Sequence, residues 1–136
     1  AAEAFGPRTR LLLLNTPHNP TGKVFTRSEL ATLAELCQEW DVLAMTDEVY
    51  ERIVFDDAEH LPLATLPGMW ERTLTFNCHS KSFAMTGWRI GYIGGPKPAI
   101  DAINKLQSQM TSHITSFTQP AAVAARCVAA AATAPI

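Results

Sequence analysis

Cysteine is scarce in this sequence, and its arrangement does not suit covalent cross-linking. The 136 residues include three cysteines, which is an odd number, and none of them forms a C-x-x-C pair. They stand in apolar or alanine-rich surroundings, which argues against the disulfide framework of a small secreted domain. We therefore expect a reduced protein that works in the cytoplasm.

An excess of positive charge is also missing. Eleven Lys and Arg residues stand against 13 Asp and Glu residues, for a net charge of -2, and the basic residues are scattered. Nucleic acids and anionic membranes attract clustered basic side chains, so the composition argues against both as partners. The longest uncharged run, near the C-terminus, is mostly alanine with Arg126 inside it, and we expect no segment that targets or spans a membrane.

Several common catalytic motifs are absent as well. The four histidines have no close pairing and no Cys or carboxylate at ligand spacing, so we expect no metal site. The stretch "GYIGG" at 91–95 lacks the full G-x-G-x-x-G of dinucleotide-binding proteins, and no G-x-S-x-G or Ser/His/Asp arrangement is visible.

Strand and helix patterns alternate along the chain. Continuous apolar runs at 10–17 and 41–50 predict strands that are buried on both faces of a parallel sheet. Between them, a capping box from Thr26 to Glu29 opens a predicted helix over 25–40, so the three elements form a right-handed crossover unit. Further strands are predicted at 72–78 and 88–95, and helices at 99–110 and 119–134. The pattern predicts one α/β domain with a mostly parallel sheet flanked by helices.

Polar residues follow the predicted strands at the points where the strands end. Asn15 and Asn19 follow the first strand, Asp47 and Tyr50 end the second, and Lys81 follows the third. Each has an ordinary explanation by itself, as a turn residue, a helix cap or a solvated lysine. Their occurrence together at the carboxyl ends of one sheet, where α/β proteins bind ligands, favours a functional site.

This set of side chains suits chemistry on pyridoxal phosphate. A lysine amine attacks the cofactor's aldehyde, and an ionised carboxylate keeps the pyridine nitrogen protonated; Lys81 and Asp47 can fill these roles. An amide and a phenol can donate to the ring oxygen, and a guanidinium can bind the phosphate. Asn19, Tyr50 and Arg89, the last on a predicted strand, fit those places.

Three segments carry a resemblance to a known family. "NTPHNPTGKVF" at 15–25, "TDEVYE" at 46–51 and "SKSFAMTGWRIGY" at 80–92 resemble the signatures of class I/II aminotransferases, the fold-type I pyridoxal-phosphate enzymes. The resemblance implies an internal aldimine on Lys81, pyridoxal 5'-phosphate as cofactor, and Asn19 as a substrate contact. It implies that the catalytic residues are Lys81, Asp47 and Tyr50, and that the cofactor-binding residues are Asn19, Asp47, Tyr50, Ser80, Lys81 and Arg89.

The chain departs from the family pattern at two points. Cys78 stands where many relatives carry a phosphate-binding serine, a loss for which Ser80 can compensate. The second departure is the length of the chain. The resemblance implies that residues 1–136 are the central part of the pyridoxal-phosphate-binding large domain. The N-terminal part of that domain and the C-terminal small domain are then absent from this sequence.

A narrower resemblance concerns substrates and assembly. The stretches at 36–42 and 60–75 are similar to those of the kynurenine and glutamine–phenylpyruvate transaminases. This similarity implies that an amino group is transferred from an aromatic or sulfur-containing amino acid to a 2-oxo acid. The segment 110–117 resembles one near a homodimer interface. Two alternatives stay open: a pyridoxal-phosphate-dependent carbon–sulfur β-lyase on the same scaffold, and an inactive truncated fragment.

Overall fold

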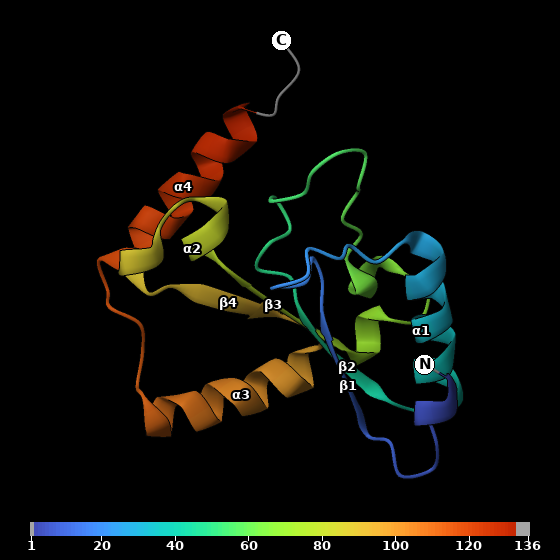
Figure 1. The fold of residues 1–136 in the computed structure, drawn as a ribbon. Helices are drawn as coiled ribbons and strands as arrows, with labels where there is room; N and C mark the ends of the chain where they lie inside the picture. Colours follow the sequence, from blue (N-terminus) through green and yellow to red (C-terminus); the bar gives the residue numbers. More distant parts are fainter. Residues whose placement is uncertain (1, 133–136) are drawn as a thin grey trace.

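A mostly parallel sheet forms the centre of the protein in the computed structural model, which describes residues 2–132 (Figure 1). Strands β1 to β3 are neighbours in chain order and parallel, and β4 is antiparallel to β3. The α/β class and the mostly parallel sheet are therefore confirmed. The strands of the described residues are β1 (Leu11–Asn15), β2 (Leu43–Asp47), β3 (Thr73–Cys78) and β4 (Gly91–Gly94).

Helix α1 (Arg27–Glu39) connects β1 to β2 and covers one face of both strands. It begins as the sequence predicts: the Thr26 side chain accepts a hydrogen bond from the Glu29 amide, and the Glu29 carboxylate accepts one from the Thr26 amide. Its apolar positions pack in a core that includes Leu14 of β1. Cys37 is fully buried there, and burial raises the pKa of its thiol, so this side chain is an uncharged part of the core.

The remaining helices follow the third strand. Helix α2 (His79–Ser82) comes directly after β3, α3 (Lys97–Met110) follows β4, and α4 (Thr118–Ala132) ends the described part of the chain. Figure 1 shows α3 and α4 on the side of the molecule opposite α1. The last two positions of the predicted terminal helix, 133 and 134, lie outside the described residues. Short 3₁₀ helices span Ala2–Ala4, Leu63–Thr65, Trp70–Arg72 and Thr86–Trp88.

The prediction that the first two strands are buried on both faces is wrong for this chain. Leu11, Leu13 and Leu43 are 49%, 72% and 54% exposed. Side chains alternate along a strand, so these three lie on the face opposite α1, and nothing in residues 2–132 covers them well. The sheet therefore has one packed face and one open apolar face.

The predicted strand at 88–95 is shorter in the structure. Trp88 ends a 3₁₀ helix, and Arg89 has φ 51° and ψ 48°, in the left-handed region that an extended strand does not use. The strand begins only at Gly91. Arg89 therefore precedes the strand instead of lying on it.

Candidate active site

The loop after β1 is tied to the end of β2. The Asn15 side chain accepts a hydrogen bond from the Asn19 amide at 3.0 Å and donates one to the Asp47 carbonyl at 3.0 Å. The Thr16 amide donates to the same carbonyl at 3.1 Å. Asn15, which the resemblance implies is a secondary residue of the pocket, thus fixes Asn19 relative to Asp47.

Asp47 is half-buried at the end of β2 and keeps part of its carboxylate available. Its Oδ1 accepts a hydrogen bond from the Val49 amide at 3.3 Å. Among residues 2–132, Oδ2 has no hydrogen-bond partner, and no Lys or Arg side chain pairs with the carboxylate. The strand backbone thus holds a carboxylate oxygen that can bind a cationic or N–H group.

Tyr50, Asn19 and Lys81 come together from three different segments. The Asn19 side-chain amide donates to the Tyr50 hydroxyl at 3.3 Å. The Lys81 ammonium lies 5.5 Å from the centre of the Tyr50 ring, and the lysine side chain is exposed. An amine, a phenol and an amide therefore come together where β1 to β3 end, and Asn15 links Asn19 to the backbone of Asp47. The sequence predicts a site at the carboxyl ends of these strands, and the roles of the residues there stay predictions.

Helix α2 carries Lys81 and Ser80. It begins at His79, whose amide donates to the Ile90 carbonyl at 3.2 Å, so this helix is anchored to the residue before β4. His79 itself is buried and its ring stacks on Phe83 at 5.1 Å between centres. Ser80 is half-buried, and no side-chain hydrogen bond joins it to the other predicted site residues within 2–132.

No hydrogen bond, ion pair or cation–π contact within the described residues joins Arg89 to this cluster. Its guanidinium donates to the Thr86 carbonyl at 2.9 Å, and it lines a separate hollow with Trp88 and Phe117. The role that the resemblance implies for Arg89, like that for Ser80, therefore stays a prediction.

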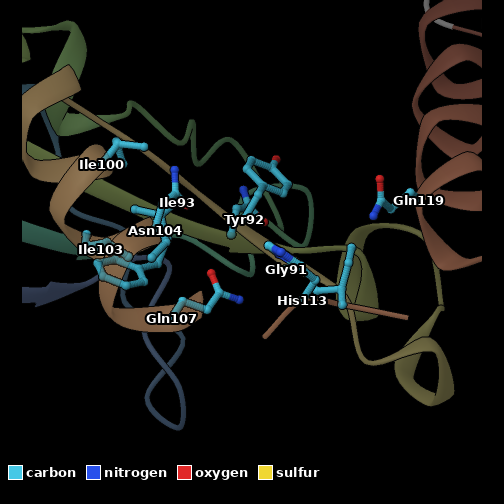
Figure 2. Close-up of a pocket in the computed structure, with 12 residues that line it drawn as sticks. Gly91, Tyr92, Ile93, Ile100, Ile103, Asn104, Gln107, His113 and Gln119 are labelled. Carbon is cyan, nitrogen blue, oxygen red and sulfur yellow. The ribbon is translucent and has the colours of Figure 1, made fainter. Parts of the chain in front are cut away.

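Two open hollows of similar volume lie in different parts of the molecule. The one drawn in Figure 2, of about 530 Å³, has Tyr92, Asn104 and His113 among its lining residues and contains none of the predicted catalytic residues. The other, of about 500 Å³, has Asn19 and Tyr50 in its wall. Tyr50 of the second hollow contacts Lys81, and Asn19 is linked through Asn15 to the backbone of Asp47, although neither Lys81 nor Asp47 lines that hollow. We therefore locate the candidate site at its edge.

Sequence reasoning missed one pair of residues next to this site. Glu48, which directly follows Asp47, has a side chain that is 1% exposed, and its Oε2 lies 2.9 Å from Nε2 of His60. Twelve positions separate the two residues, a spacing that no local motif marks. The sequence offers no local signal for the burial of Glu48, because Glu is rarely fully buried unless it is paired and the partner lies far along the chain.

The chain is similar to several aminotransferases. It is 54% identical over 119 residues to a Petunia hybrida protein named bifunctional aspartate aminotransferase and glutamate/aspartate-prephenate aminotransferase, covering 87% of this chain and 25% of that protein. It is 46% identical over 126 residues to kynurenine–oxoglutarate transaminase 1 of Mus musculus, covering 93% and 29%. The chain thus spans about a quarter of the length of the curated relatives it matches.

Solved structures agree with these relatives. N-succinyldiaminopimelate aminotransferase from Mycobacterium tuberculosis superposes with a TM-score of 0.85 at 42% identity, covering 92% of this chain and 33% of that one. The relatives differ in the substrates they are named for, so similarity does not single out one substrate class. The model of the family "Aminotransferase class I and II" matches residues 1–131, and the chain belongs to that family.

Proposed function

We propose that this chain is the central part of the large domain of a longer, pyridoxal-phosphate-dependent aminotransferase, which moves an amino group from an amino acid to a 2-oxo acid. The observation that carries the proposal is the cluster of Lys81, Tyr50, Asn19 and Asp47 where three parallel strands end. Family membership supports the reaction class.

The side chains of the cluster fit the cofactor chemically. Asp47 Oδ2 has no partner within residues 2–132 and can accept a hydrogen bond from a protonated pyridine nitrogen. The phenol of Tyr50 and the amide of Asn19 can donate to the ring oxygen, and Lys81 can bind the aldehyde carbon. Ser80 and Arg89 are the proposed donors to the phosphate. When bound, the cofactor withdraws electrons from the bonds at the substrate Cα.

Each residue then has a defined task. The Nζ atom of Lys81 removes the proton from the Cα of the amino donor and later returns a proton. From α2, the amine must therefore reach both the atom that loses the proton and the atom that receives it. The negative charge of Asp47 stabilises positive charge at the ring nitrogen. Asn19 lies at the wall of the adjacent hollow and contacts substrate from there.

We further propose that the donor is an aromatic or sulfur-containing amino acid and that the whole enzyme is a cytoplasmic homodimer. One group of relatives is named for kynurenine, an aromatic amino acid, which favours the aromatic part of this proposal, whereas other relatives are named for aspartate. Met110 and Phe117, at the ends of the segment proposed to lie near the dimer interface, are 72% and 68% exposed. Separately, no helix among residues 2–132 is long and apolar enough to cross a membrane.

The test uses the full-length protein with pyridoxal phosphate. It is supplied with phenylalanine, methionine or aspartate as donor and 2-oxoglutarate as acceptor, and with a cysteine conjugate in a parallel reaction. Formation of glutamate together with the matching 2-oxo acid supports the proposal. Release of pyruvate and a thiol from the conjugate without glutamate formation would instead support a carbon–sulfur β-lyase.

A further inference from the structure

The Glu48–His60 contact is more deeply buried than any ion pair between a carboxylate and a Lys or Arg among residues 2–132. Its two side chains are 1% and 6% exposed, whereas each of the other pairs has at least one member that is 40% exposed or more. A carboxylate taken out of water needs hydrogen-bond partners; among residues 2–132 the imidazole meets Oε2 of Glu48, and Oε1 has no partner. The pair lies immediately behind the candidate site.

The backbone of Glu48 is fixed from two sides. Its amide donates to the Phe76 carbonyl of β3 at 2.9 Å, so it extends the pairing of β2 by one residue. Its carbonyl accepts from the Glu51 amide at 2.9 Å, which closes a turn with Val49 and Tyr50 at the centre. Glu48 is thus the fixed first residue of the turn that carries Tyr50.

The side chains of this segment face in opposite directions. Thr46 and Glu48 are buried while Asp47 between them is half-buried, as alternation along an extended strand requires. The carboxylate of Glu48 therefore enters the packed layer, while Asp47 lies on the face of the candidate site. Residues 55–59, between the turn and His60, are all exposed, so His60 is where this connection returns to the protein interior.

We propose that Glu48 and His60 are positioning residues of the proposed aminotransferase, because their contact anchors the turn that presents Asp47 and Tyr50 to the cofactor. The inference rests on the proposed function. The pair touches neither substrate nor cofactor. It acts through the backbone of residues 47–50, and loss of the contact lets the phenol of Tyr50 move away from Asn19 and Lys81.

The test compares variants of the full-length enzyme loaded with pyridoxal phosphate. His60→Ala removes the contact, whereas His60→Gln keeps an N–H donor at about the reach of Nε2. Thr73→Val is the matched control, because Thr73 is equally buried but lies at the other end of the sheet, paired with Ala44. For each variant, kcat, KM, the cofactor dissociation constant and the absorption spectrum of the bound cofactor are measured.

We expect His60→Ala to lower kcat by about 10- to 100-fold, the effect of a small misplacement in an active site, with KM changed by less than about threefold. The spectrum of the bound cofactor shifts, since Tyr50 and Asn19 contact its ring oxygen. His60→Gln restores kcat to within about threefold of the unmodified enzyme, and Thr73→Val leaves both kcat and spectrum unchanged. If His60→Ala does not fold, His60→Asn, whose amide falls short of Glu48, replaces it.

Two results overturn the inference. One is a folded His60→Ala or His60→Asn enzyme with normal kcat and an unaltered cofactor spectrum. The other is equal impairment by His60→Gln and His60→Ala, which shows that the donor to Glu48 is not what matters. Lys81→Ala is assayed in parallel. If Lys81→Ala keeps its activity, the proposed function itself fails. If Lys81→Ala is inactive and His60→Ala is normal, only the positioning role is refuted.

Discussion

Replacing Asp47 by asparagine isolates the charge of one site residue from its shape. Asparagine keeps the size of the side chain and an oxygen that can accept the hydrogen bond from the Val49 amide. The strand around it is held by the Asp47 carbonyl, which accepts from the Asn15 side chain and the Thr16 amide, and neither bond uses the carboxylate. We therefore expect Asp47→Asn to fold normally.

The size of the kinetic effect follows from the lost charge. Two opposite charges in contact at about 4 Å attract by about 4 kcal/mol at an effective dielectric constant of about 20, a value suited to a half-buried group. If that stabilisation is needed in the transition state, its loss lowers kcat by about a thousandfold. The affinity for the cofactor falls less, because Lys81, Tyr50, Asn19 and the phosphate contacts persist.

The assay is steady-state transamination by the full-length enzyme, with the cofactor dissociation constant measured on the same preparation. Asp47→Glu serves as the control, since it keeps the charge and alters the reach. The assignment is refuted if Asp47→Asn transaminates within tenfold of the unmodified enzyme, or if its rate and its cofactor affinity fall by the same factor.

Three further predictions concern the scaffold. Thr26→Val removes the side-chain cap of α1 and should lower the stability of the folded protein by about 1 kcal/mol in chemical denaturation; no change would contradict the capping role. The hydrogen bond from Lys23 and those from the Thr26 cap hold the pKa of Glu29 at about 2, below its usual 4.5. Above about pH 4.5, the unmodified protein should therefore unfold at a higher temperature than Glu29→Gln, and the difference should disappear as the pH falls toward 2. A difference in unfolding temperature that grows in acid would contradict this role of Glu29. Residues 1–136 expressed alone should self-associate through the open face of Leu11, Leu13 and Leu43, and they should lack transaminase activity. Sedimentation should show less self-association for Leu13→Ser. A monomeric, active fragment would contradict this.

Local patterns in the sequence were enough to predict most of the elements. The capping box at Thr26 and Glu29 satisfies backbone groups within one turn, so its sequence signature is complete in itself. The apolar runs likewise predicted β1 and β2, and the polar residues after them proved to be neighbours because parallel strands end at one edge.

What the sequence did not reveal depends on contacts between distant segments. The exposure of Leu13 depends on what covers the second face of the sheet, which the residues of the run cannot specify. The left-handed backbone of Arg89 interrupts a sequence that otherwise favours a strand. The Glu48–His60 contact joins a strand end to the far end of an irregular connection, whose path no periodicity predicts.

The central claim is that Lys81 bonds covalently to pyridoxal phosphate. The most direct measurement treats the cofactor-loaded, full-length protein with borohydride, which makes such a bond permanent, and maps the labelled peptide by mass spectrometry. The account predicts the cofactor on Lys81, and its loss in Lys81→Ala. Label on Lys23, Lys97 or Lys105 instead, or no covalent label on a protein that transaminates, would contradict it.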